Sequence, residues 1–151
     1  MTDGDDVLCC FLDVIPRMFH TLMQGFESQV AQSAGIKKTQ MKALLTLART
    51  GEIPLSQISW YVGIERGSMT AVARKLEAGG LITAGQDAAD KRKVLVRLTP
   101  EGEILSRACA DEIRSTLAAR TRLLPEEDRF RIREACALFR EVMENSEGRL
   151  S

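Results

Sequence analysis

The hydrophobic pattern of this chain changes its period at Gly79-Gly80, and no other feature constrains the fold as strongly. Before these glycines, apolar residues recur every three or four positions, which predicts amphipathic helices. After them, segments 81–83 and 94–98 are β-prone and enclose a long, charged stretch at 85–93. That arrangement predicts a β-hairpin with a charged tip. The chain is therefore expected to combine helices with one small sheet.

Four helices are predicted ahead of the hairpin. In chain order they span about 7–30, 39–51, 54–63 and 66–78. Thr39 is the expected N-cap of the second helix. The third and fourth helices are short and meet at a tight turn at Gly63, which makes them a helix-turn-helix candidate. A helix-turn-helix followed at once by a β-hairpin is a winged helix.

Two further helices are predicted after the hairpin. Thr99 is the expected cap of the first, Pro100 suits its first turn, and the second begins near Pro125. The chain is thus expected to be mainly α-helical with a small β-hairpin. The predicted parts are an N-terminal helix in 1–35, a winged helix-turn-helix in 36–99 and C-terminal helices in 100–151. The apolar stripe of the first helix is wider than one small domain would bury, which favours a partner surface.

The charges of the chain are segregated. Its 21 basic and 21 acidic residues give a net charge of zero, which by itself would argue against nucleic acid. Residues 36–97, however, hold 11 basic and 5 acidic residues, a net charge of +6, whereas 1–35 and 98–151 carry −4 and −2. The cations therefore gather in the predicted winged helix, where a DNA-binding module needs them.

Several other classes of protein have little support in the sequence. No apolar run is long enough to span a membrane, and the acidic start of the chain does not resemble a signal peptide. The four cysteines form no metal-binding pattern with the single histidine, so no metal or cofactor is expected. No catalytic motif is present, and an enzyme is not expected. A cytoplasmic protein with free thiols is the simplest interpretation.

Three motifs in register resemble the MarR family of bacterial transcription regulators. They are Leu-Glu-Ala-Gly-Gly-Leu-Ile at 76–82, Asp-Ala-Ala-Asp-Lys-Arg at 87–92 and Val-Arg-Leu-Thr-Pro-Glu-Gly at 96–102. The resemblance implies a homodimer held together by the N-terminal and C-terminal helices. It implies that each protomer places its fourth helix in a major groove of double-stranded DNA and its wing along a minor groove. Two-fold symmetry then predicts a pseudo-palindromic operator, and repression is the family's usual mode.

The resemblance also assigns candidate DNA contacts to individual residues. Arg92 matches the wing arginine of the family, and Asp90 is expected either to orient it or to cap the turn. The family often has a basic residue where this chain has Ala71 or Ala84, so Lys91 and Lys93 are candidates to replace those contacts. The full set of candidates is Arg66, Gly67, Ser68, Thr70, Ala71, Arg74, Lys75, Asp90, Lys91, Arg92 and Lys93.

The resemblance also implies a signal that such a regulator senses. Many family members bind small, often aromatic acids where the dimerisation helices meet the DNA-binding lobe, and Arg17, His20, Met23 and Met41 are candidates for such a pocket. Ordinary packing is the simpler interpretation of each of these residues. Two alternatives stay open. One is oxidant sensing through Cys9 or Cys10, and the other is a winged helix that binds proteins and no DNA.

Overall fold

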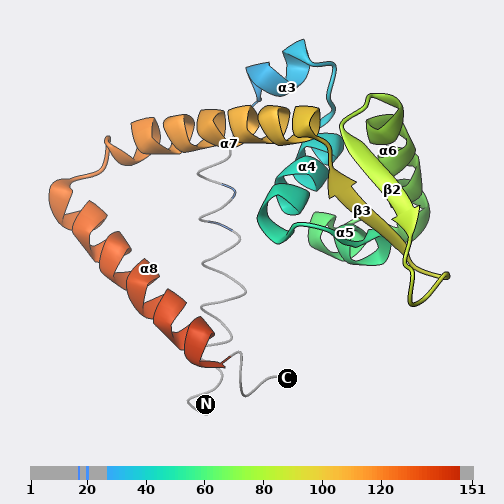
Figure 1. The fold of residues 1–151 in the computed structure, drawn as a ribbon. Coiled ribbons are helices and arrows are strands. Elements are labelled where there is room, and N and C mark those ends of the chain that lie inside the picture. The colour runs from blue at the N-terminus through green and yellow to red at the C-terminus, as the bar shows by residue number, and fades with distance from the viewer. Residues whose placement is uncertain (1–16, 18–19, 21–26, 147–151) are drawn as a thin grey trace. The chain divides into compact units, whose positions relative to one another are not determined.

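The computed structural model describes residues 17, 20 and 27–146. Its elements, shown in Figure 1, are α3 (Gln29–Ser33), α4 (Lys38–Thr50), β1 (Ile53–Pro54), α5 (Leu55–Val62), α6 (Arg66–Ala78), β2 (Ile82–Gln86), β3 (Val94–Leu98), α7 (Pro100–Thr121) and α8 (Glu126–Ser146). One compact unit comprises Gly25–Arg114 and contains the winged helix. Residues Ser115–Ser151 belong to a second unit, with Met1–Gln24. The predicted class, mainly α-helical with a winged helix, is confirmed.

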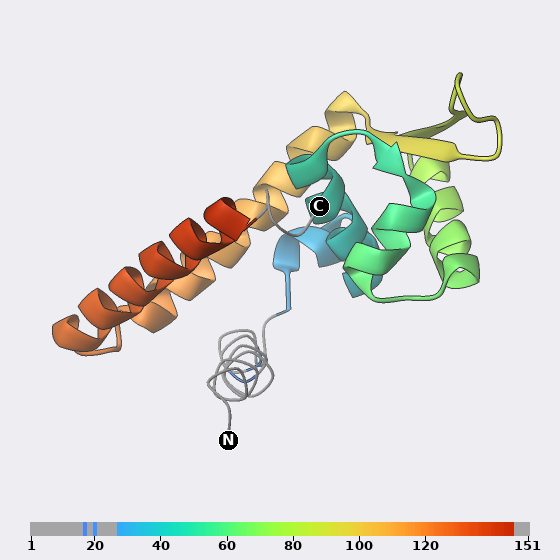
Figure 2. The same cartoon turned by 90° about the horizontal axis from the view of Figure 1, so that it is seen from below.

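The winged helix consists of α4, α5 and α6 and a three-stranded antiparallel sheet in the order β1-β3-β2. Gly63 ends α5 with a left-handed backbone (φ 74°, ψ 39°), and this turn lets α6 start three residues later. Strands β2 and β3 pair from Ile82 opposite Leu98 to Gln86 opposite Val94. Figure 2 shows the hairpin extending beyond α6, so that its tip is exposed as a wing.

A hydrophobic core ties these helices to the sheet. Its most deeply buried large side chains are Leu44, Ile58, Met69, Leu76, Ile82 and Val96, none more than 2% exposed. Each element of the winged helix except β1 supplies at least one of them. The core therefore fixes the position of α6 relative to the sheet, and with it the position of the helix that is predicted to read DNA.

The turn that follows α6 packs tightly against the start of α7. The hydroxyl of Thr99 accepts a hydrogen bond from the backbone N–H of Gly102 (3.0 Å) and donates one to the carbonyl of Gly80 (2.6 Å), so the predicted N-cap is confirmed. A Cβ atom on Gly102 would lie 2.0 Å from the carbonyl oxygen of Leu81. Glycine is required at this position because the two backbones approach so closely.

The predicted C-terminal end of the first helix is wrong. It was expected to continue to Val30, but Glu27 and Ser28 are not helical, and α3 starts afresh at Gln29. Ser28 is extended and its hydroxyl accepts a hydrogen bond from Ala31, which makes it the N-cap of a new helix. Apart from Arg17 and His20, which are helical, the rest of the prediction lies outside the described residues.

Two smaller expectations are also corrected. The N-cap of α4 is Lys37 and not Thr39, because the Gln40 side chain accepts a hydrogen bond from the Lys37 N–H (3.0 Å) and closes the first turn earlier. The sheet has a third strand, β1, in which Ile53 lies opposite Val96. This strand has two residues and one of them is proline, so it carries no alternating pattern.

Helix α8 differs from the helices of the winged helix in its burial. None of its described side chains is buried, and it exposes large apolar groups such as Phe130 (54%) and Leu138 (62%). None of the helices within the described part of the chain is long and apolar enough to cross a membrane.

Candidate nucleic-acid interface

Helix α6 presents most of the predicted DNA contacts on its exposed side. Its opposite side buries Met69, Ala73 and Leu76 in the core, so the intervening residues are turned outward. The candidates on the helix that are exposed are Arg66, Gly67, Ser68, Ala71, Arg74 and Lys75. The structure thus brings the helical candidates together on one surface, with cations near both ends of the helix.

Thr70 and Gly67, both near the start of α6, offer a ligand less than an exposed, free side chain would. Thr70 is half-buried, and its hydroxyl donates a hydrogen bond to the carbonyl of Arg66 (3.0 Å), so only its lone pairs are available to a ligand. Gly67 has open space around it, because an added Cβ would meet no atom within 4 Å. Nothing in the fold requires glycine at position 67, whereas the absence of a side chain there allows close approach of another molecule.

The wing tip holds Arg92 in a defined orientation. One carboxylate oxygen of Asp90 accepts hydrogen bonds from the backbone N–H and the Nε of Arg92, both 3.1 Å. Its second oxygen accepts from the guanidinium at 3.4 Å. Asp90 therefore both caps the turn and orients the arginine, the two roles that the sequence left open. The Arg92 side chain is 91% exposed, so its remaining donors face outward.

The same contacts keep Asp90 ionised. The hydrogen bonds from the Arg92 side chain, and then from its backbone, hold the pKa of the Asp90 carboxyl below its ordinary range. The turn itself is closed by hydrogen bonds from Asp87 N–H to the Lys93 carbonyl and from Lys93 N–H to the Asp90 carbonyl. Lys91 and Lys93 are exposed on this tip.

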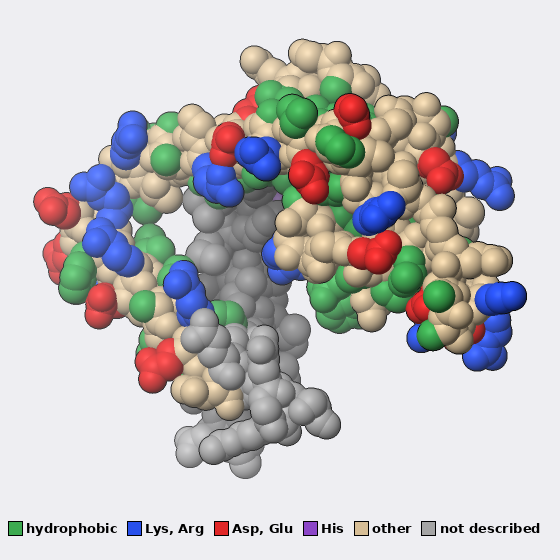
Figure 3. Space-filling view, viewed as in Figure 1, with side chains coloured by type: hydrophobic (Ala, Val, Ile, Leu, Met, Phe, Trp, Pro, Cys, Tyr) green, Lys and Arg blue, Asp and Glu red, His purple; other side chains and the backbone are tan. Residues whose placement is uncertain are grey.

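Apart from Arg92, the exposed cations of this surface are not neutralised by a neighbouring carboxylate among the described residues. Within the described ranges, Arg92 is the only cation of α6 and the wing tip that has an ion pair, and that pair is with Asp90. Figure 3 shows Lys and Arg side chains gathered at the edge formed by α6 and the hairpin tip. An unpaired cationic edge on an exposed helix and wing is suited to phosphate groups.

Of the four residues predicted for an effector pocket, only Met41 belongs to the compact unit Gly25–Arg114. Met41 is buried (6% exposed) in a small cluster with Ala31 and Cys109, so it packs in the core. Arg17 and His20 are exposed, and Met23 lies outside the described residues. The simpler interpretation therefore holds for Met41.

The described residues instead form a hollow of about 750 Å³ between the end of α4, the base of the wing and α7. Arg97 contributes from β3, where its Nε donates to the hydroxyl of Thr83 on β2 (3.1 Å). Arg107 and Arg114 contribute from α7, and Arg114 is paired with Asp111. Arg107 and Arg114 are seven residues apart, which places them on one face of a helix. This spacing is the sequence signal that could have indicated the hollow.

A polar cluster joins α3 to α7. The Glu112 carboxylate accepts hydrogen bonds from the Ser28 hydroxyl (2.5 Å) and the backbone N–H of Gln29 (2.8 Å). The bond from Ser28 holds the Glu112 pKa below its ordinary range. Beside it, burial raises the pKa of the Cys109 thiol, which makes this cysteine unreactive. Cys136 is exposed on α8, whereas Cys9 and Cys10 lie outside the described residues.

Other kinds of site find no support in the residues that the structure describes. They include no group of three His, Cys, Asp or Glu side chains placed to hold a metal ion.

The exposed Trp60 and Tyr61 lie edge to face, with ring centroids 5.0 Å apart, and the Arg49 guanidinium lies 5.3 Å from the Tyr61 ring.

Comparisons with known proteins show what this chain is similar to. The MarR-family sequence profile matches residues 36–94. The transcriptional regulator YfiV of Bacillus subtilis is 25% identical over 107 residues, 71% of this chain and 67% of YfiV. The regulator FarR of Neisseria gonorrhoeae is 29% identical over 84 residues, 56% of this chain and 58% of FarR. Both relatives are named as helix-turn-helix transcriptional regulators.

Solved structures show the same fold. A crystal structure of NadR in complex with 4-hydroxyphenylacetate superposes with a TM-score of 0.66 at 24% identity, covering 85% of this chain and 91% of NadR. The PcaV regulator of Streptomyces coelicolor, in complex with its natural ligand, gives a TM-score of 0.57 at 20% identity over 89% of each chain.

Proposed function

We propose that this chain, whose residues 36–94 match the MarR-family profile, acts as a homodimeric, sequence-specific DNA-binding regulator that represses transcription in the cytoplasm. The observation that carries the proposal is the wing tip, where Asp90 fixes the Arg92 guanidinium while leaving it 91% exposed. A planar cation held in this way suits the narrow and electronegative minor groove of A·T-rich DNA. The exposed side of α6 then occupies the adjacent major groove.

A gel-shift assay with the DNA upstream of the protein's own gene, at two salt concentrations, tests this proposal. We expect a complex at low salt that weakens steeply as salt increases, because phosphate contacts release counterions. Arg92→Ala should weaken the complex about tenfold, the loss of one good groove contact, while leaving the oligomeric state unchanged. Arg133→Ala, which removes an exposed cation from α8, is the matched control and should have little effect. Absence of any complex at low salt would refute DNA binding.

We further propose that a small aromatic acid binds in the hollow between α4, the wing base and α7 and releases the operator. The three arginines that line it, Arg97, Arg107 and Arg114, offer donors for a carboxylate. The NadR complex shows that a protein of this fold accommodates 4-hydroxyphenylacetate. That compound is therefore a suitable probe.

Calorimetry and gel shifts with 4-hydroxyphenylacetate test the effector proposal. We expect binding to the wild-type protein and release of DNA, and about tenfold weaker binding to Arg107→Gln, which loses one charged donor. Arg122→Gln, an exposed arginine outside the hollow, serves as the control. Equal binding by both variants would contradict the assignment of the hollow.

Two alternatives to this function have distinct outcomes. If the protein senses oxidants, peroxide should release DNA from the wild type but not from the Cys9→Ser/Cys10→Ser variant. If the winged helix is a protein-binding module, the protein should bind no DNA at any salt concentration, even though its fold and dimer are intact.

A further inference from the structure

Helix α4 begins with an unusual concentration of cations. Lys37 is its N-cap, Lys38 is its first residue and Lys42 lies one turn further, and all three side chains are exposed. The first turn has no acidic residue. Because the N-terminus of a helix carries a partial positive charge, lysines at this position weaken the helix, and acidic residues would stabilise it. The fold alone therefore gives no reason for these lysines.

No interaction within the described part of the chain compensates for them. Neither ion pairs nor side-chain hydrogen bonds to a carboxylate involve Lys37, Lys38 or Lys42 among the described residues. Lys38 and Lys42 are four residues apart, so they lie on one face of the helix. The opposite face of α4 buries Leu44 and Leu47 in the core. Three unpaired cations are thus directed away from the core.

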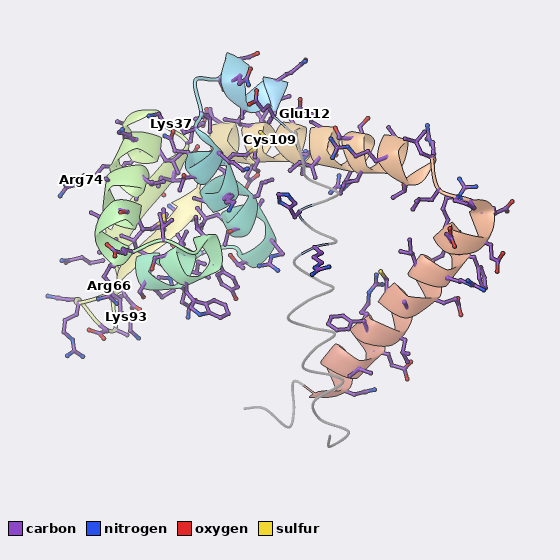
Figure 4. The ribbon with its side chains drawn as sticks, turned by 180° about the vertical axis from the view of Figure 1, so that it is seen from behind. Lys37, Arg66, Arg74, Lys93, Cys109 and Glu112 are labelled. Atoms are coloured by element: carbon purple, nitrogen blue, oxygen red, sulfur yellow. The ribbon has the colours of Figure 1, made fainter. Side chains whose placement is uncertain are left out.

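The location of these lysines connects them with the candidate DNA surface. Helix α4 packs against α6 through the shared core that contains Leu44 and Ala73. In Figure 4, Lys37, Arg74, Arg66 and Lys93 follow one edge of the winged helix, with Lys37 at one end and the wing residue Lys93 at the other. The cationic surface therefore continues past α6 to Lys37, in the direction away from the wing.

We propose that Lys37, Lys38 and Lys42 bind DNA phosphates on the side of the major groove opposite to the wing. The inference rests on the proposed DNA binding of this protein. Two sugar-phosphate backbones border a major groove, so a helix seated in that groove has one backbone on each side. The wing contacts one side, and the α4 lysines contact the other. They also supply cations that α6 and β2 lack, where alanines occupy positions 71 and 84.

The proposal is tested by the salt dependence of DNA binding and by thermal stability, measured together on Lys38→Glu. Removing one phosphate contact per protomer should reduce the slope of log K against log salt by about 1.8 for a dimer, at about 0.9 per contact. Affinity at low salt should fall at least about tenfold. The melting temperature should rise, because a carboxylate replaces an ammonium at a helix N-terminus. Weaker binding by a more stable protein separates a DNA contact from a structural role.

Arg49→Glu is the matched control, since it makes the same charge change in the last turn of the same helix. Its slope should equal that of the wild type, and its melting temperature should fall, because a cation stabilises a helix C-terminus. Equal loss of slope in both variants would mean a general charge effect and would overturn the proposal, as would an unchanged slope in Lys38→Glu.

Ethylation interference on the bound DNA locates the contacts directly. Wild-type protein should show interfering phosphates on both borders of each major groove, and Lys37→Ala/Lys38→Ala should lose those opposite to the wing. If the wild type binds DNA but the double variant keeps every interfering phosphate, this inference fails while the proposed function stands. If the wild type binds no DNA at low salt, the proposed function itself fails.

Discussion

At the scale of single residues, Gly102 lies where the fold leaves no space for a side chain. The Leu81 carbonyl oxygen would be 2.0 Å from an added Cβ, and this neighbour is backbone, which cannot rotate away. Gly102→Ala should therefore separate the turn that follows α6 from the start of α7. We expect a loss of about 3 kcal/mol in the free energy of unfolding, measured by chemical denaturation.

Gly67 provides the matched comparison, because it is also a helical glycine but has open space around it. Gly67→Ala should stabilise the protein by about 0.5–1 kcal/mol through helix propensity alone. If DNA approaches the backbone closely at this position, the same variant should bind more weakly. A similar loss of stability in both glycine variants would contradict the distinction between them.

The candidate DNA residues show what a sequence can predict at this scale. The Asp90–Arg92 pair was predictable, because both partners lie within one turn and the contact is local. The burial of Met41 beside Cys109 was not, since those residues are 68 positions apart and only the packing of α4 on α7 brings them together. The arginine-lined hollow was missed for the same reason.

At the scale of elements, Glu112 fastens α3 to α7 by capping the start of α3. The hydrogen bond from Ser28 lowers the pKa of Glu112 in the folded protein, so the ionised form of Glu112 is the one that stabilises the fold. That contribution is complete above the unfolded pKa, about 4.3, and is lost as the pH falls through the lower folded value. The melting temperature of the wild type should therefore decline below about pH 4.

The matched variants are Glu112→Gln and Glu134→Gln, the second an exposed carboxylate in the middle of α8. Glu112→Gln should be less stable than the wild type at pH 7, and the difference should shrink on acidification. Glu134→Gln should follow the wild-type profile. Thermal melts between pH 3 and 7 measure both. A difference that is constant with pH would show that the Glu112 charge is not what stabilises the contact.

The elements also differ in how far the sequence predicts them. Helix α6, strand β3 and helix α7 are long and periodic, so their positions follow from the hydrophobic pattern. Strand β1 has two residues and is held only by its pairing with β3. The break at Ser28 replaces a continuous apolar pattern with a capped turn, because the Glu112 carboxylate, distant in sequence, binds the start of α3. Tertiary contacts decided both cases.

At the scale of the whole molecule, the exposed apolar surface of α8 supports the proposed homodimer. Phe130 and Leu138 are more than half exposed. Contact of such large apolar side chains with water is unfavourable, and a second protomer would bury them. Leu138→Glu should convert a dimer into monomers, as measured by analytical ultracentrifugation, and should reduce operator affinity by at least about 100-fold, because two half-sites are no longer bound together.

Arg140→Glu is the control for this dimer prediction, since position 140 lies on the opposite side of α8 from Leu138 by helical geometry. It should remain dimeric. A Leu138→Glu protein that stays dimeric and binds DNA normally would place the dimer interface elsewhere.

The close contact between Leu81 and Gly102 also limits where the chain can change in length. The Thr99 N–H donates to the Leu81 carbonyl at 3.1 Å, so the two ends of the hairpin are tied together at its base. Residues inserted or deleted at 87–93 would alter only the exposed tip, whereas a change near the base would displace α7. Residues 87–93 can consequently be exchanged without disturbing the helices. Replacing them with the wing tip of a related regulator should give this protein the minor-groove preference of that regulator.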